Sequence, residues 1–192
     1  MAEFIAETIG QFGYLGVALL MFIETVIPPI PSELIMPLVG LAAARGEITL
    51  VGAIVAATLG STIGATAWYG FARAIGRQRL LRFAARYGRW VGLNEEVTDR
   101  AATWFAERGG WAIFIGRILP AARVYISIPA GLAHMPMGRF LIFTVAGFTL
   151  WYGFLGVAGF AFAHWINPTV LTWGTIIGVL VGLPLLHLLR KR

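Results

Sequence analysis

Long apolar stretches alternate with short polar interruptions along this chain, and they predict membrane-spanning helices. Residues 48–75 carry no charged side chain except Arg73 near their end, and residues 140–163 and 169–189 carry none. A helix needs about 20 apolar residues to cross the hydrocarbon core of a bilayer. Each of these three segments is therefore expected to cross the membrane completely.

The stretch 12–44 is just as apolar, but Pro28, Pro29 and Pro31 interrupt it in the middle. Proline lacks a backbone donor and disfavours helix at the residue before it. Each half is then about 23 Å long, which is shorter than a hydrocarbon core of about 30 Å. We expect a re-entrant hairpin that returns to its own side, with Ser32 as the N-cap of the returning half.

Residues 110–133 show the same broken pattern, and a shift of 91 residues relates the two stretches. The shift aligns Pro29 with Pro120, Gly40-Leu41-Ala42 with Gly131-Leu132-Ala133, and Thr58-Leu59 with Thr149-Leu150. We expect two repeats, 12–75 (hairpin 12–44, span 48–75) and 110–163, in which Pro129 and Gly131 also belong to the second break. One full crossing separates the repeats and inverts the second, as in many secondary transporters.

Composition supports a membrane protein. Of 192 residues, 58% are hydrophobic and 12% are charged, about half the charged fraction of roughly 25% in soluble domains. Cysteine is absent, which excludes disulfides and thiol chemistry. The sequence therefore predicts one all-α integral membrane domain over residues 1–192. Within the first span, Gly60-xxx-Gly64 indicates close packing inside the molecule, with a homodimer face as the alternative.

The net charge of +6 arises largely from a basic segment over residues 76–108 and from the tail Arg190-Lys191-Arg192. The arginines of 76–108 gather on one side of a helical wheel, so we expect a cytoplasmic amphipathic helix in the membrane interface. Residues 2–11 predict another such interfacial helix. The positive-inside rule places the C-terminus in the cytoplasm. The basic residues are thus interpreted as a signal for membrane topology, and binding of anionic lipid is an equal alternative. No nucleic-acid partner is expected.

Four charged residues at the breaks carry the candidate chemistry: Glu24, Glu33, Arg117 and Arg123. One such charge costs about 2.5–3.5 kcal/mol at a helix centre, so the four must face one another or a watery cavity. Arginine offers a fork of donors that matches phosphate, and we expect Arg117 and Arg123 to bind one. Burial favours the neutral form of a carboxyl group and a nearby arginine favours the charged form, so Glu24 and Glu33 are expected to exchange protons.

Two Glu–Arg pairs that merely hold the hairpins together are the structural alternative. Tyr125, Ser127 and His134 lie near the breaks and are weaker candidates for the lining of a cavity. The spacing of the histidines predicts no metal site, and no cofactor is expected. A lipid phosphatase would need a histidine nucleophile supported by a second histidine and a carboxylate, and only His134 is near. The sequence therefore does not favour an enzyme.

The motifs at the two breaks resemble those of the DedA family of membrane proteins, and the likeness covers residues 12–165. They are Phe22-Ile23-Glu24, Pro29-Ile30-Pro31-Ser32-Glu33, Gly116-Arg117-Ile118-Leu119-Pro120 with Arg123, and Pro129-Ala130-Gly131 with Met135 and Phe140. The resemblance implies a bacterial inner-membrane protein that moves lipids between leaflets and depends on the proton motive force. It also implies roles in the cell envelope, and it makes the acidic pair and both arginines essential. Many relatives have Gly-Asp or Gly-Glu at Ser32-Glu33.

The sequence and the resemblance together predict a proton-coupled flippase for a phosphate-bearing lipid. Undecaprenyl phosphate, the carrier lipid of wall synthesis, is the expected substrate. Phosphatidylethanolamine, general phospholipid scrambling, and transport of a small ion or oxyanion are the alternatives.

Overall fold

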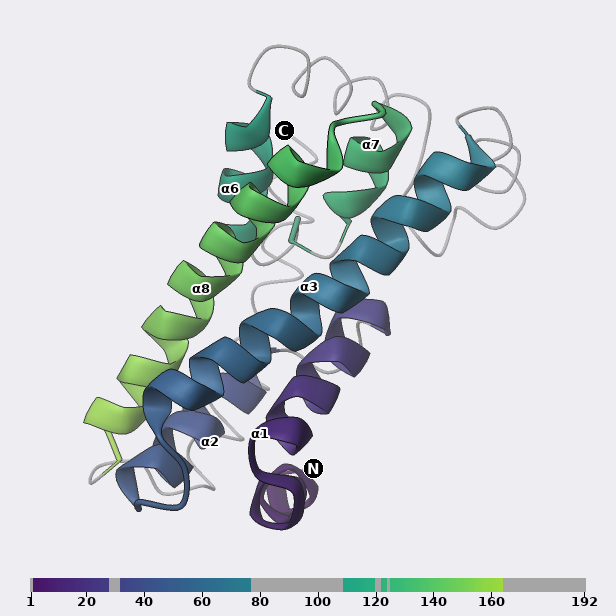
Figure 1. The fold of residues 1–192 in the computed structure, drawn as a ribbon. Helices are drawn as coiled ribbons and strands as arrows, with labels where there is room; N and C mark the ends of the chain where they lie inside the picture. Colours follow the sequence, from purple (N-terminus) through teal and green to yellow (C-terminus); the bar gives the residue numbers. More distant parts are fainter. Residues whose placement is uncertain (1, 28–31, 77–108, 120–121, 124, 164–192) are drawn as a thin grey trace, which may run out of the picture.

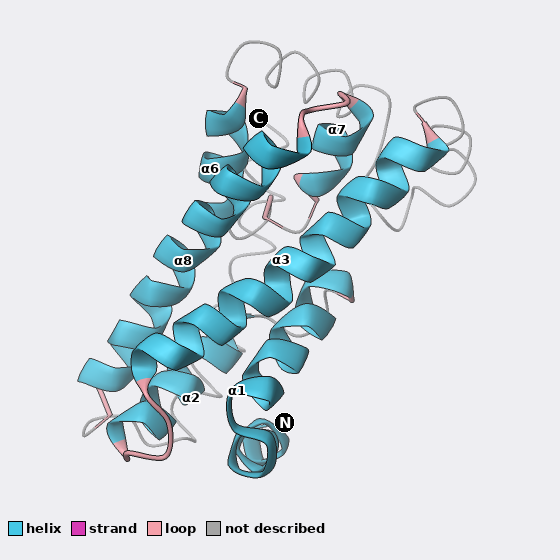
Figure 2. Cartoon of the chain, in the orientation of Figure 1, coloured by secondary structure: helices cyan, strands magenta, loops and turns pink. Residues whose placement is uncertain are grey.

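The computed structural model describes residues 2–27, 32–76, 109–119, 122–123 and 125–163, and within these the chain is helical, joined by turns and loops (Figures 1 and 2). In chain order the helices are α1 (Ala2–Val26), α2 (Ser32–Ala44), α3 (Leu50–Ile75), α6 (Gly110–Ile118), α7 (Ser127–Leu132) and α8 (Met137–Ala161). The predicted all-α class is confirmed for this part of the chain.

Three of these helices are long and apolar enough to cross a membrane: Glu7–Val26 within α1, Leu50–Ile75 and Met137–Ala161. The spans expected over 48–75 and 140–163 are thus present. The first of the three runs across Gly13, where two helical segments of α1 meet at a kink. The segment before Gly13 was expected as a separate helix over residues 2–11, and the segment after it as the first half of the hairpin. Gly13 has φ 54° and ψ −128°, a conformation that favours glycine, and it kinks α1 there.

The helices pair across the two halves of the chain. Helix α1 packs against α3, and α6 packs against α8. Helix α2 also packs against α8, α7 packs against α3, and the two long helices α3 and α8 contact each other. Figure 1 shows α2 and the start of α1 towards one end of the molecule and α6 and α7 at the other end. Glu24 near the end of α1 and Glu33 near the start of α2 both contact Arg123, which lies between α6 and α7.

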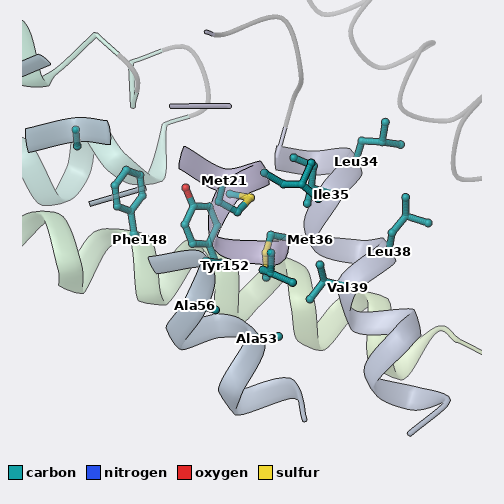
Figure 3. Packing of buried hydrophobic residues seen from close by; sticks show 14 of the residues in the cluster. Met21, Leu34, Ile35, Met36, Leu38, Val39, Ala53, Ala56, Phe148 and Tyr152 are labelled. Carbon is teal, nitrogen blue, oxygen red and sulfur yellow. The ribbon is translucent and has the colours of Figure 1, made fainter. Parts of the chain in front are cut away.

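Small residues allow the helices to come this close. A side chain at Gly60 would collide with the carbonyl oxygen of Ala18 on α1, and a Cβ at Gly64 would lie 3.0 Å from Cβ of Thr25. Gly60-xxx-Gly64 therefore faces α1, as expected for packing within the molecule, and the alternative of a dimer face at these glycines is wrong. The buried apolar side chains around this contact come from α1, α2, α3 and α8, and Figure 3 labels Met21, Leu34, Ile35, Met36, Leu38, Val39, Ala53, Ala56, Phe148 and Tyr152.

Several predictions lie outside the described residues. These are the interfacial segment 76–108 beyond Gly76, the C-terminal span 169–189, the basic tail, and the break residues Pro28, Pro29, Pro31 and Pro120.

Candidate functional site

The four charged residues of the two breaks lie at helix ends. Glu24 is in the last turn of α1 and Glu33 is in the first turn of α2. Arg117 is in the last turn of α6, and Arg123 lies between α6 and α7. Glu24, Arg117 and Arg123 are buried. An acidic residue in the first turn of a helix is stabilised by the helix dipole, so Glu33 is placed favourably.

Arg123 joins the two broken regions. Its Nη2 donates to Oε1 of Glu24 at 3.0 Å and to Oε2 of Glu33 at 2.9 Å. One nitrogen from the second half of the chain thus binds two carboxylates that lie on opposite sides of the first break. The Glu24 side chain is 3% exposed and that of Glu33 is 29% exposed. Glu33 is therefore the more exposed of the two carboxylates.

The guanidinium of Arg123 retains donors that nothing in the described residues uses. Its Nε and Nη1 are buried and have no hydrogen-bond partner. The guanidinium also lies 5.9 Å from the centroid of the Trp151 ring. A buried donor without a partner is costly, and an arginine fork matches carboxylate and phosphate anions. The geometry therefore suits an additional anion beside Arg123.

Arg117 makes different contacts. Its Nη1 donates to the backbone carbonyl of Arg123, and its Nη2 donates to Oγ of Ser127 at 2.7 Å. The guanidinium lies 4.7 Å from the centroid of the Phe148 ring on α8, a cation–π distance. No described carboxylate pairs with Arg117. Two Glu–Arg pairs are therefore present, and both are made by Arg123.

A hydrogen-bond network connects Glu24 to the crossing of α3 and α8. Thr25 Oγ1 donates to the carbonyl of Met21 at 2.8 Å and lies 3.3 Å from Oε2 of Glu24. Ser61 Oγ donates to the same carbonyl at 3.3 Å and accepts from the Tyr152 hydroxyl at 2.8 Å. Sequence reasoning missed Thr25, Ser61 and Tyr152. A usable signal existed, because Ser61 and Tyr152 are 91 residues apart, the offset of the repeat predicted from the sequence.

The remaining predicted residues take varied positions. Ser32 is the first residue of α2, and its buried Oγ has no hydrogen-bond partner, so the predicted N-cap bond is not formed. The helix includes Ser32, whereas a capping residue precedes the helix. Pro129 and Gly131 lie inside the short helix α7. Proline is tolerated in a first helical turn, where the N–H has no intrahelical partner.

Two weaker candidates lie away from the charged centre. Tyr125 is exposed, and His134 is exposed with its Nδ1 3.0 Å from the carbonyl of Leu132. Ser127, the third, contacts Arg117. Among the described residues, no group of three His, Cys, Asp or Glu side chains is placed to hold a metal ion.

Apolar spans around a buried charged centre define a helical membrane protein with an internal polar site. The chain belongs to the VTT-domain family, that is, the DedA family of membrane proteins, since the model of the VTT domain matches residues 27–161.

Curated relatives include proteins of several bacteria. Undecaprenyl phosphate transporter A of Staphylococcus aureus is 37% identical over 151 residues, which cover 79% of this chain and 74% of the relative. The Bacillus subtilis protein of the same name is 34% identical over 150 residues, covering 77% and 72%. A Lactococcus lactis protein named alkaline phosphatase-like protein is 39% identical over 181 residues, covering 94% and 81%. No solved structure matches the chain.

Proposed function

We propose that this protein is a flippase that moves undecaprenyl phosphate between the leaflets of the bacterial inner membrane, coupled to protons. The names of two relatives support the choice of lipid. The observation that carries the proposal is the state of Arg123, which is held by two carboxylates through one nitrogen while its buried Nε and Nη1 have no hydrogen-bond partner.

The lipid phosphate would bind at Arg123, where the donors without a partner could form charge-assisted hydrogen bonds. Arg117, at the end of α6, would support Arg123 through its bond to the Arg123 carbonyl. The polyprenyl chain would remain in the bilayer, next to the exposed apolar side chains of the long helices, such as Ile63 on α3 and Phe154 on α8. Only the phosphate then needs a polar path, and the buried charges at the breaks provide one.

Proton coupling would follow because the two carboxylates and the lipid phosphate compete for the guanidinium of Arg123. An ionised carboxylate accepts hydrogen bonds from the guanidinium, and protonation removes its charge and reduces its hold. Protonation of Glu33, the more exposed of the two, and then of Glu24 would free Nη2 for the phosphate. Lipid phosphate and protons would therefore bind together and be released together.

Two inverted repeats would supply alternating access. Hydroxyl groups of Thr58 and Thr149 lie 3.5 Å apart, and those of Ser61 and Tyr152 lie 2.8 Å apart, each pair being separated by the repeat offset of 91 residues. Equivalent residues that touch each other lie on a two-fold axis. The exchange of partners, α2 with α8 and α7 with α3, also fits such an axis. The two halves would rock about the α3–α8 crossing, with the C-terminus on the cytoplasmic side.

Proteoliposomes test the proposal. Labelled undecaprenyl phosphate should move between leaflets with the wild-type protein, and Arg123→Gln should abolish the movement. Phosphatidylethanolamine and inorganic phosphate, assayed in the same vesicles, test the alternatives of phospholipid scrambling and oxyanion transport. Release of phosphate from the lipid would instead favour an enzyme, in line with the name of the Lactococcus relative. Unchanged movement in Arg123→Gln would contradict the proposed site.

A further inference from the structure

Arg117 and Arg123 differ in the hydrogen-bond partners of their terminal guanidinium nitrogens. Arg117 is 0% exposed, and both of its terminal nitrogens bind atoms of the protein itself. Arg123 binds the two carboxylates through one terminal nitrogen, and its other terminal nitrogen is buried without a hydrogen-bond partner. The two arginines are therefore suited to different tasks.

The partners of Arg117 lie on both sides of the second break. Its Nη1 holds the backbone carbonyl of Arg123, and its Nη2 holds the hydroxyl of Ser127, the first residue of α7. The same guanidinium belongs to the last turn of α6. A single side chain thus links the end of α6, the backbone of Arg123 and the start of α7. This link fixes the backbone from which the Arg123 side chain reaches Glu24 and Glu33.

Helix α8 packs against the Arg117 side chain. The guanidinium lies 4.7 Å from the Phe148 ring centroid and 5.8 Å from that of Phe140. A Cβ at Gly147 would come within 2.6 Å of Cβ of Arg117, so glycine is needed for the side chain to pass. The remaining nitrogen, Nε, is buried and has no hydrogen-bond partner. A lipid phosphate would have to displace the contacts of both terminal nitrogens to bind the fork of Arg117, whereas one terminal nitrogen of Arg123 has no partner to displace.

We propose that Arg117 is a positioning residue: it holds Arg123 in place through the Arg123 carbonyl and Ser127, and it does not contact the transported phosphate. The inference rests on the proposed lipid transport. Ser127 has a role as well, because its hydroxyl is the second hydrogen-bond partner of the Arg117 guanidinium. Only a planar fork can hold both partners at once, and a lysine ammonium has a different geometry.

Transport of labelled undecaprenyl phosphate, measured as a function of lipid concentration, tests this inference. Ser127→Ala should raise the half-saturating concentration about ten-fold, the effect of one lost hydrogen bond to a charged group. Ser127→Thr should restore it. Arg117→Lys should lose as much as Arg117→Gln, and Ser127→Ala should add nothing in the Arg117→Gln background. Thr66→Val is the matched control, because that hydroxyl bonds only to the Thr62 carbonyl within α3.

Two outcomes would overturn the inference. Additive effects of Ser127→Ala and Arg117→Gln would show that the two residues act separately. Near-normal transport by Arg117→Lys, with Ser127→Ala like wild type, would show that Arg117 acts as a charge for the phosphate. Failure of the proposed function would look different, since the wild-type protein would not move the lipid or Arg123→Gln would move it normally.

Discussion

Ser61 on α3 and Tyr152 on α8 are 91 residues apart in the sequence, and their hydroxyl groups form a buried hydrogen bond of 2.8 Å. The neighbouring pair of Thr58 and Thr149 has the same separation. Both pairs join positions that the proposed repeat would make equivalent, at the crossing of the two long helices. The crossing therefore links the two halves of the molecule directly beside the hydrogen bonds that reach Glu24.

The hydroxyl of Tyr152 should contribute to stability. Tyr152→Phe keeps the ring stacked on Phe148 and removes the donor to Ser61. We expect a loss of about 1 kcal/mol in the free energy of unfolding, typical of one buried hydrogen bond. Unfolding in detergent micelles measures it, with Tyr125→Phe as a control because that side chain is exposed. Equal stability of Tyr152→Phe and wild type would contradict the structural role.

A cross-link at the α3–α8 crossing should not stop transport. The chain has no cysteine, so the double variant Thr58→Cys, Thr149→Cys forms a single defined pair where the native hydroxyls lie 3.5 Å apart. Helices that rock about this point keep their contact there, and oxidation should leave at least half of the transport rate. The single-cysteine variants and reduction of the disulfide are the controls. Complete inhibition on oxidation would place the moving interface at this crossing instead.

Close contact of α1 and α3 should make Gly60 intolerant of any side chain. Gly60→Ala places a methyl group against the carbonyl of Ala18, and such overpacking typically costs 1–3 kcal/mol, so we expect about 2 kcal/mol. Gly70→Ala in the same helix is the matched control, because no heavy atom lies within 4 Å of a Cβ there. That change should be neutral or stabilising. Similar unfolding of both variants would show that α1 does not press on Gly60.

The carboxylates should connect lipid movement to the proton gradient. Glu33→Gln and Glu24→Gln imitate the protonated side chains and weaken the charged hold on Arg123. We expect both variants to bind undecaprenyl phosphate at least as tightly as wild type, and their transport should no longer respond to a pH gradient. In wild type, binding should tighten as the pH falls. If transport by the double variant Glu24→Gln, Glu33→Gln still responded to a pH gradient as wild type does, these residues would be excluded from proton coupling.

Much of the fold followed from the sequence because lipid imposes simple rules. Uninterrupted apolar stretches predicted α3 and α8, and the cost of buried charge indicated that the breaks would meet in the interior. A helix over residues 2–11 was predicted, but its junction with the next helical segment at the Gly13 kink was not, since a glycine kink leaves little trace in an apolar pattern. The sharing of Arg123 by Glu24 and Glu33 was not predicted either, because contacts between partners 99 and 90 residues apart depend on how the helices cross.

The different contacts of the two arginines were likewise beyond the sequence. Arg117 and Arg123 both have mainly apolar neighbours in the sequence. Their roles differ because Ser127 and Phe148 lie against Arg117 in space, which the sequence does not reveal. Ser32 shows the same limit on a smaller scale, since a shift of one residue in the helix start turns a capping side chain into a buried hydroxyl without a partner.

Binding to the purified protein tests most directly whether Arg123 holds the lipid phosphate. The affinity for undecaprenyl phosphate is compared with that for undecaprenol, which has the same chain and no phosphate, in wild type and in Arg123→Gln. We predict that wild type prefers the phosphate form at least ten-fold and that Arg123→Gln binds both lipids equally. A preference for the phosphate that survives in a folded Arg123→Gln protein would contradict the account.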